Sequence, residues 1–318
     1  MWERVLDRAD VHDPEARQGY TAQLQAVRRF APAEYLAARL LLPSPVQPDI
    51  VALVAFMHET DDRIDRGLRQ EREAALRRWR DLTSEALTSG ASSQPVLQTL
   101  AWTVRRHPGL HGRIGAFLDG AVKEVRWERF GSEAEVERYI EDYSLPALML
   151  SMCLLAPAAA AAAADFERAC LALITAMQRL DFLEDIAEDV QEGRIGISDE
   201  ALARHGLTAA DLGPEAAGTA PVAALVAGQA ATAGVYLEAA RPIAALAATE
   251  YRPFLRAVLR VQEARSAAVL KAGASLVAHP CRPSAARCGA ALIREMVRRN
   301  NLWKRGDTQG SCVKRGSQ

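Results

Sequence analysis

The stretch 178-QRLDFLEDIAEDVQEGRIG-196 combines the apolar spacing of a buried helix with six carboxylates. No basic residue occurs among the acidic positions that begin at Asp181. At about 100° per residue, Gln178, Asp181, Asp185 and Asp189 fall on one side of a single helix about three turns long. A solvated helix face usually places Lys or Arg four residues from Asp or Glu. The stretch is therefore either a solvated acidic face or a face turned towards something strongly positive.

A second acidic segment has the sequence 49-DIVALVAFMHETDDRIDRG-67, and its apolar run predicts a buried helix. Asp61 and Asp65 are one turn apart and share a face with His58, while Asp62 lies to the side. Two carboxylate stripes on different helices suit Mg²⁺, which takes oxygen ligands and completes its shell with substrate phosphates. An isolated DDxxD string is a weak signal and more often marks an acidic surface helix.

Helical periods dominate the 318 residues, of which 49% are hydrophobic and 25% charged. No alternating strand pattern persists, so we predict an all-α protein. Residues 88–95 and 206–221 resemble loops between helices. We expect an N-terminal segment at 1–27, a single helical domain at 28–300 and a flexible basic tail at 301–318.

Several features bear on cellular location and on partners. The five cysteines form no CxxC motif and the first residues are too charged for a signal peptide, which favours a cytoplasmic location. Residues 145–164 carry no charge, but prolines interrupt them, so we expect a buried helix followed by an alanine-rich connector rather than a membrane span. Peripheral contact with a membrane remains compatible with this composition. The net charge of −1 argues against nucleic acid as a partner.

Four ordered blocks resemble the squalene/phytoene synthase family, the head-to-head branch of the all-α isoprenoid synthases. The sequence TDDRID is similar to the first aspartate-rich motif of that family and stands eighteen residues after Pro43, the interval that the family keeps. The opening stretch is similar to the second motif, and EALARHGL follows it as a similar segment does in the family. Between the two motifs, GAVKEVRWERFGSEAEVERY (120–139) resembles a further family block. The resemblance runs from about residue 28 to residue 270.

The resemblance implies an isoprenoid synthase helical barrel around a central apolar cavity, with Mg²⁺ as cofactor and a prenyl diphosphate as substrate. The implied catalytic residues are Asp61, Asp65, Asp185 and Asp189. The implied metal ligands are Asp61, Asp62, Asp65, Asp181, Asp185 and Asp189. The residues implied to contact substrate are Tyr35, His58, Gln178, Asp181, Glu184, Arg129 and Arg194.

The sequence departs from the family at several residues. The resemblance implies that these residues bind diphosphate or shape the second prenyl pocket. A Ser-Lys-Ser segment is replaced by Pro32, Ala33 and Glu34, and an arginine before the first motif is replaced by His58. In the second motif Asp181 replaces asparagine and Glu184 replaces arginine, and Pro146 stands where the family has an A-G-T segment. Two diphosphates need several Arg and Lys donors. One diphosphate on a metal cluster is easier to accommodate in this chain than two.

We therefore expect a prenyltransferase that ionises one allylic prenyl diphosphate and transfers the prenyl group to a non-isoprenoid acceptor, with an aromatic ring as the expected type. One alternative is an enzyme that condenses two prenyl diphosphates head to head or cyclises a terpene. The other is a non-catalytic lipid-binding protein. The intact aspartates count against the last. Candidates for the base that deprotonates the alkylated ring are Glu34, His58, Glu184 and a diphosphate oxygen. Each of the three side chains is equally well explained as a solvent-facing or packed residue.

Overall fold

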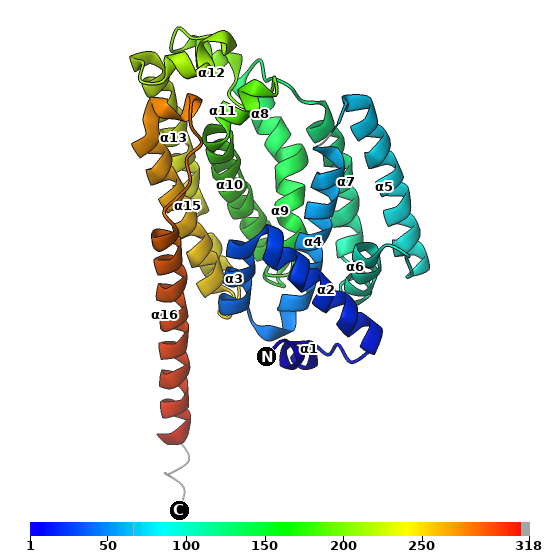
Figure 1. Ribbon diagram of the computed structural model, residues 1–318. Helices are drawn as coiled ribbons and strands as arrows, with labels where there is room; N and C mark the ends of the chain where they lie inside the picture. Colours follow the sequence, from blue (N-terminus) through cyan, green and yellow to red (C-terminus); the bar gives the residue numbers. More distant parts are fainter. Residues whose placement is uncertain (66, 313–318) are drawn as a thin grey trace, which may run out of the picture.

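Helices form the regular secondary structure of the computed structural model, which describes residues 1–65 and 67–312, with the side chains of Glu34 and of residues 299–312 outside the description (Figure 1). The α-helices are α1 (Trp2–Arg8), α2 (Pro14–Phe30), α3 (Pro32–Leu41), α4 (Gln47–Ile64), α5 (Arg69–Ser89), α6 (Pro95–Arg106), α7 (Leu110–Arg126), α8 (Glu133–Tyr139), α9 (Leu145–Met152), α10 (Ala160–Glu184), α11 (Ile186–Gln191), α12 (Asp199–Ala203), α13 (Ala220–Ala240), α14 (Ile243–Leu246), α15 (Arg252–Ala272) and α16 (Ala285–Cys312). Short 3₁₀ turns are η1 (Ser44–Val46), η3 (Ala209–Leu212), η4 (Pro214–Ala216) and η5 (Gly273–Val277), and η2 (Ile140–Ser144) is a π turn. Among the described residues no strand is present, so the predicted all-α class is confirmed.

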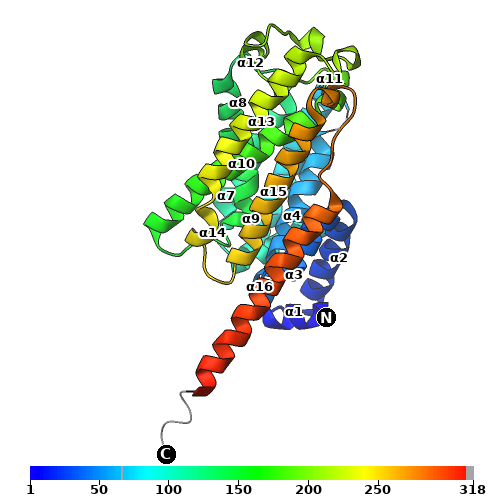
Figure 2. The ribbon, with the colours of Figure 1, turned by 90° about the vertical axis from the view of Figure 1, so that its left-hand side faces the viewer.

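The long helices surround a common interior, as Figures 1 and 2 show from two sides. The ring can be traced from helix to packed helix. On one side α4 contacts α5 and α6, α5 contacts α7, and α7 contacts α9. On the other side α9 packs on α10, α10 on α13, and α13 on α15, while α3 contacts both α15 and α4 and closes the ring. The C-terminal ends of α4 and α10 lie near the same end of the ring, close to α11 (Figure 1). This arrangement brings the two acidic segments together.

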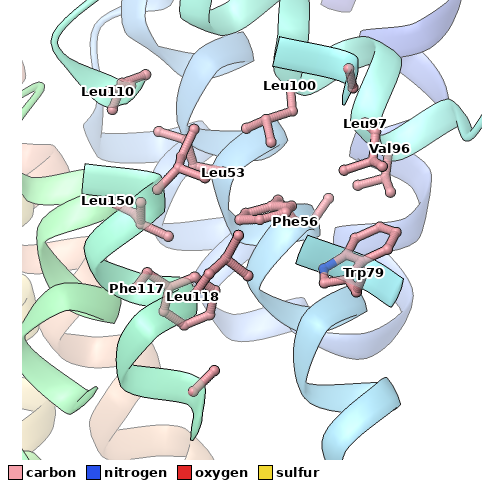
Figure 3. Packing of buried hydrophobic residues seen from close by; sticks show 14 of the residues in the cluster. Leu53, Phe56, Trp79, Val96, Leu97, Leu100, Leu110, Phe117, Leu118 and Leu150 are labelled. Atoms are coloured by element: carbon pink, nitrogen blue, oxygen red, sulfur yellow. The ribbon is translucent and has the colours of Figure 1, made fainter. Parts of the chain in front are cut away.

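One hydrophobic cluster fixes α4 against α5, α6 and α7 (Figure 3). Phe56 and Trp79 are fully buried, with ring centroids 6.0 Å apart. The indole of Trp79 donates a hydrogen bond of 2.8 Å to Thr60 Oγ1, one residue before Asp61. Burial of each such ring stabilises the fold by about 2 to 3 kcal/mol. The core therefore also fixes the helical turn that carries the first acidic motif.

A second cluster joins α3, α9, α10, α14 and α15. Val54, Cys153 and Leu154 contact both clusters yet remain only partly buried. Partly exposed apolar side chains between two cores are what a chamber for an apolar group requires. The central apolar cavity itself stays a prediction.

The acidic stretch 178–196 is not one continuous helix, which corrects the sequence expectation. Helix α10 ends at Glu184 and α11 begins at Ile186, with Asp185 at φ −101° and ψ 3° between them. Aspartate is a poor residue for a helix interior. The backbone N–H of Asp185 still donates to Asp181 O at 3.0 Å, and that of Asp189 to Asp185 O at 2.9 Å, so the helical path continues past the break.

The uncharged segment 145–164 divides differently from the expectation. The predicted buried helix is present as α9, but the connector covers only residues 153–159. The alanines from Ala160 onward form the first turns of α10, because alanine is the strongest helix former.

Gly120 allows α7 to approach η2 closely. A Cβ atom at this position would lie 2.1 Å from the backbone oxygen of Asp142 and 3.0 Å from the Cα atom of Tyr143. Backbone atoms cannot move aside as a flexible side chain can, so glycine is required here. The contact places Tyr143 of η2 beside the site described below.

By length and composition alone, the described residues include one segment that could cross a membrane, Ala220–Leu246, and a third of its most apolar window is buried. A buried core helix meets the same criteria, and α13 packs along α10. At the C-terminus, α16 continues to Cys312 and so crosses the boundary expected at residue 300 (Figure 2). Residues 313–318 of the expected tail lie outside the described residues.

Candidate active site

The two acidic segments meet at a cavity of about 190 Å³. Asp65 comes from the end of α4, and Asp185 and Asp189 come from the junction of α10 and α11. The volume is below the 300 to 1,000 Å³, roughly, of pockets that enclose whole ligands, so it suits a polar head group. The residues that line it are Asp65, Glu124, Trp127, Tyr139, Gln178, Asp181, Phe182, Asp185, Asp189 and Arg194.

Asp61 lies one turn before Asp65 and accepts a hydrogen bond of 3.2 Å from the hydroxyl group of Tyr143. Burial, and then the charge of Asp65, raise the pKa of Asp61 from 3.8 to about 7. Burial also raises the pKa of Asp65, against the lowering effect of Arg194. A cation bound between Asp61 and Asp65 would lower the pKa of both carboxylates.

The second segment has the same electrostatic character. Burial and the charge of Asp181 raise the pKa of Asp185 to about 6. Burial raises the pKa of Asp189 to about 6, although Arg194 opposes this shift. Perturbed carboxylates gathered at a cavity are typical of functional sites.

Arg194 faces these carboxylates from the loop after α11. Its Nη1 lies 3.3 Å from Glu124 Oε1 and its Nη2 lies 3.1 Å from Glu192 Oε2. Glu124 is buried and also accepts hydrogen bonds from Trp127 Nε1 at 3.0 Å and from the hydroxyl group of Tyr139. The guanidinium group of Arg194 is thus already engaged by carboxylates.

Asp181 and Glu184 share one cation, Arg265 of α15. Arg265 Nη2 donates to Glu184 Oε2 at 2.7 Å and to Asp181 Oδ1, while its Nη1 donates to Gln262 Oε1 at 2.9 Å. The side chain of Glu184 is 11% exposed and does not line the cavity. Glu184 is therefore held in a buried ion pair, which disfavours it as a base at the cavity mouth.

The remaining residues implied by the resemblance lie in different surroundings. His58 stacks on Phe30 with ring centroids 3.5 Å apart, and its Nε2 lies 3.7 Å from Asp62 Oδ2. Tyr35 packs against the first hydrophobic cluster. Arg129 forms an ion pair with Asp199 and is not among the cavity-lining residues. The side chain of Glu34 lies outside the described residues.

Within the described part of the chain, no three His, Cys, Asp or Glu side chains converge on one point as a complete metal cage would require. The carboxylates lie instead on two helix ends that face one cavity. Mg²⁺ keeps several waters and is held by one or two carboxylates plus substrate phosphates, so an all-protein cage is not needed. The oxygen-only donor set and the raised pKa values fit magnesium bound together with a diphosphate.

Comparison with known proteins identifies the family and the fold. The family model described as Squalene/phytoene synthase matches residues 27–287. A solved dehydrosqualene synthase has the same fold, with a TM-score of 0.77 and 20% sequence identity over 90% of this chain and 98% of that chain. The chain belongs to the squalene/phytoene synthase family. The squalene synthase HpnC from Alicyclobacillus acidocaldarius also shares the fold, with a TM-score of 0.71 and 19% identity over 83% of this chain and 98% of that chain.

Curated squalene/phytoene synthase relatives match over part of their length. The Bifunctional protein CrtB/UppS of Streptomyces coelicolor is 31% identical over 64% of this chain and 35% of that protein. Phytoene synthase 3, chloroplastic, of Zea mays is 27% identical over 59% of this chain and 44% of that protein. The matched part of this chain thus spans less than half the length of either relative.

Sequence reasoning missed several residues that the squalene/phytoene synthase fold brings to the cavity. Glu124, Trp127 and Tyr139 line it, and all three lie in the block 120–139 that resembles the family. The resemblance of that block to the family was the sequence signal for these residues. Glu124, four positions after Gly120, could have been assigned to the site from it. No local signal identifies Arg265, because its partners lie 81 and 84 positions earlier in the chain.

Asp61 makes the stability of the metal-free protein depend on pH. Its raised pKa means that the folded chain binds the proton more tightly than the unfolded chain. The resulting stabilisation is fully present below the unfolded pKa of 3.8 and is lost as the pH rises through about 7. Asp61→Asn lacks this titration, so its free energy of unfolding relative to wild type should rise by about 2 to 4 kcal/mol from about pH 4.5 to about pH 8.

Denaturant unfolding of both proteins across this pH range, in buffer freed of divalent ions, measures the difference. Repeating it with Mg²⁺ and a non-hydrolysable diphosphate provides the control and should shrink the difference. If the difference in the free energy of unfolding does not change with pH, the pKa of Asp61 is not raised in the folded protein and the prediction is wrong.

Proposed function

We propose that this protein ionises an allylic prenyl diphosphate with the help of Mg²⁺ and transfers the prenyl group to an acceptor that lacks phosphate, of which an electron-rich aromatic ring is the best match. Membership of the squalene/phytoene synthase family supports the prenyl-transfer chemistry. The choice of an acceptor without phosphate rests on one observation: the arginines at and beside the acidic cavity already form ion pairs with protein carboxylates. Both Arg194 and Arg265 are already paired with two carboxylates each.

In this proposal Asp61, Asp65, Asp185 and Asp189 hold the metal, and Asp62 and Asp181 lie beside them. Bound magnesium would stabilise the negative charge that develops on the leaving diphosphate. A bound cation would lower the pKa of each carboxylate that holds it, and so would oppose the raising effects of burial and of the neighbouring carboxylates.

Other side chains would orient the substrate and exclude water. Ser144 Oγ donates to Gln178 Oε1 at 2.9 Å, so the Nε2 group of Gln178 can donate to a phosphate oxygen. Apolar side chains beyond the head-group cavity, Val54 and Leu154 among them, would surround the carbocation. His58 or a diphosphate oxygen would accept the proton from the alkylated ring.

The charge inventory favours one diphosphate. Two diphosphates carry more negative charge than the metals neutralise, and additional Arg or Lys donors would have to bind the second. Arg72, a third cation near Asp65, donates to the backbone oxygen of Ile64 at 3.3 Å and keeps its charge, so one guanidinium group remains for the single diphosphate. His58 stands on the first acidic helix, and its ring stacks on Phe30.

Head-to-head condensation of two prenyl diphosphates is the second candidate. The names of the structural relatives favour it, since they are a dehydrosqualene synthase and a squalene synthase. Their sequence identity to this chain is 20% and 19%, which carries the fold and not the substrate pair. The two candidates differ in how many diphosphates each product releases.

Incubation with a series of prenyl diphosphates, with and without aromatic acceptors, separates the candidates. We expect little coupled dimer from a prenyl diphosphate alone, and one diphosphate released per prenylated product when an acceptor is present. Product mass spectrometry and a diphosphate assay measure both quantities, with Asp185→Asn as the inactive control. Efficient formation of a head-to-head product with two diphosphates released would replace the proposal with the second candidate.

A further inference from the structure

A second cavity, of about 540 Å³, lies between the α13–α14 junction, α15 and α16. Figure 2 shows α14 and α16 away from the end of the ring that carries α11, and so away from the acidic cavity. Five arginines and one carboxylate line it, together with three apolar residues. The charged lining residues are Arg241, Arg252, Arg256, Arg260, Arg294 and Glu263.

A fully buried carboxylate, Glu295, forms ion pairs with two of these arginines. Glu295 of α16 is 0% exposed, and its oxygens lie 2.8 Å from Arg256 Nε and 3.3 Å from Arg260 Nη2. Arg298 adds a third contact to Glu295 at 3.4 Å. Arg260 Nη1 is buried and has no hydrogen-bond partner among the described residues. One carboxylate thus holds three guanidinium groups and leaves positive charge at the cavity wall.

Of the other arginines, Arg241 is neutralised by two carboxylates, whereas Arg252 is not. Arg241 pairs with Glu238 at 2.6 Å and with Glu263 at 3.3 Å. Arg252 donates to the backbone oxygens of Ala247 and Ala245 at 3.1 and 3.3 Å, contacts that orient it without cancelling its charge. Including Glu238 and Glu295, the cluster retains more cations than carboxylates.

We propose that this arginine-lined cavity is a binding site for an anion of the phosphate class, separate from the acidic cavity. The guanidinium group presents a planar fork of donors that matches phosphate oxygens in bidentate geometry. Pairing with Glu295 orders the arginines before a ligand arrives, which lowers the entropy cost of binding. Ala244, Ala245 and Leu259 supply an apolar wall for the carbon part of a phosphate ester.

The phosphate group could belong to a lipid head group or to a free phosphate or diphosphate. Ile293 and Val297, one turn apart on α16, are 56% and 47% exposed next to Arg294 and Arg298 in sequence. A helix that presents apolar and basic side chains together suits an anionic lipid surface. The proposal does not depend on the reaction proposed above.

Calorimetric titration with inorganic phosphate and diphosphate, in buffer freed of divalent ions, tests the free-anion source. Flotation with vesicles of phosphatidylglycerol, compared with phosphatidylcholine, tests the lipid source. Without metal the acidic cavity repels anions, so a signal does not arise there, and the variants below locate it. Saturable binding of either probe supports the proposal and identifies the source.

Variants locate the binding. Arg294→Gln should weaken affinity about ten-fold, because a charge-assisted hydrogen bond is lost while the buried Glu295 contacts remain. Glu263→Gln should strengthen it several-fold, because it removes the carboxylate that lines the cavity. Arg78→Gln, at an exposed position of α5, is the matched control and should change nothing. The proposal is overturned if no probe binds, or if Arg294→Gln and Glu263→Gln both bind as the wild type does.

Discussion

Turnover of a prenyl diphosphate should fall by about a hundredfold to a thousandfold in Asp61→Asn, Asp65→Asn, Asp185→Asn and Asp189→Asn. Removing a group that stabilises developing charge in a transition state typically costs this much. The substitutions keep the shape of each side chain and remove one charge, at the cavity wall for Asp65, Asp185 and Asp189 and at the preceding turn of α4 for Asp61. The metal-free variants should therefore fold at least as well as the wild-type protein. Steady-state rates with and without Mg²⁺, together with thermal melting, measure both effects.

Glu188→Gln is the matched control, because Glu188 belongs to the same acidic stretch but is exposed and does not line the cavity. Its rate should stay within a few-fold of wild type. Chelation should abolish activity and added Mg²⁺ should restore it. If all four aspartate variants retain near-normal turnover, the assignment of the metal site fails.

The spacing of the carboxylates was sufficient to predict two acidic helix faces, and the resemblance to the family implied that these faces meet. Asp61 and Asp65 in one segment, and Asp185 and Asp189 in the other, are four positions apart, and periodicity is the signal that a sequence carries most directly. The break at Asp185 was not predictable from the same pattern, because a one-residue departure from helical dihedrals leaves the spacing unchanged. Helix ends are in general less well determined by sequence than helix existence.

Contacts between distant positions could not be predicted in this way. Glu184 read as an additional negative charge near the cavity mouth, because no basic residue lies three or four positions from it in the sequence. The structure supplies the cation from α15, through Arg265, and buries the pair. Likewise Tyr143 reaches Asp61 only because Gly120 lets α7 and η2 approach closely. Tertiary packing, rather than local sequence, decides which charges are neutralised.

Arg265 offers the sharpest test of that packing. Arg265→Gln should lower the free energy of unfolding by about 3 kcal/mol, because it leaves Glu184 as a buried charge without its cation. The side chains of Arg265 and Glu184 are 13% and 11% exposed, so solvent cannot compensate for the lost pair. Arg129→Gln provides the matched control, since its ion pair with Asp199 is about half exposed and should contribute about 0 to 1 kcal/mol.

The double variant Glu184→Gln/Arg265→Gln decides between an electrostatic and a packing explanation. If the cost of the single variant arises from the uncompensated carboxylate, removing that carboxylate as well should recover more than half of the lost stability. Asp181 retains a charge in the double variant, and it is 43% exposed, so water can solvate it. Chemical denaturation of the wild type, both single variants and the double variant gives the coupling energy. Equal instability of Arg265→Gln and the double variant would mean that Arg265 acts through its packing and not through its charge.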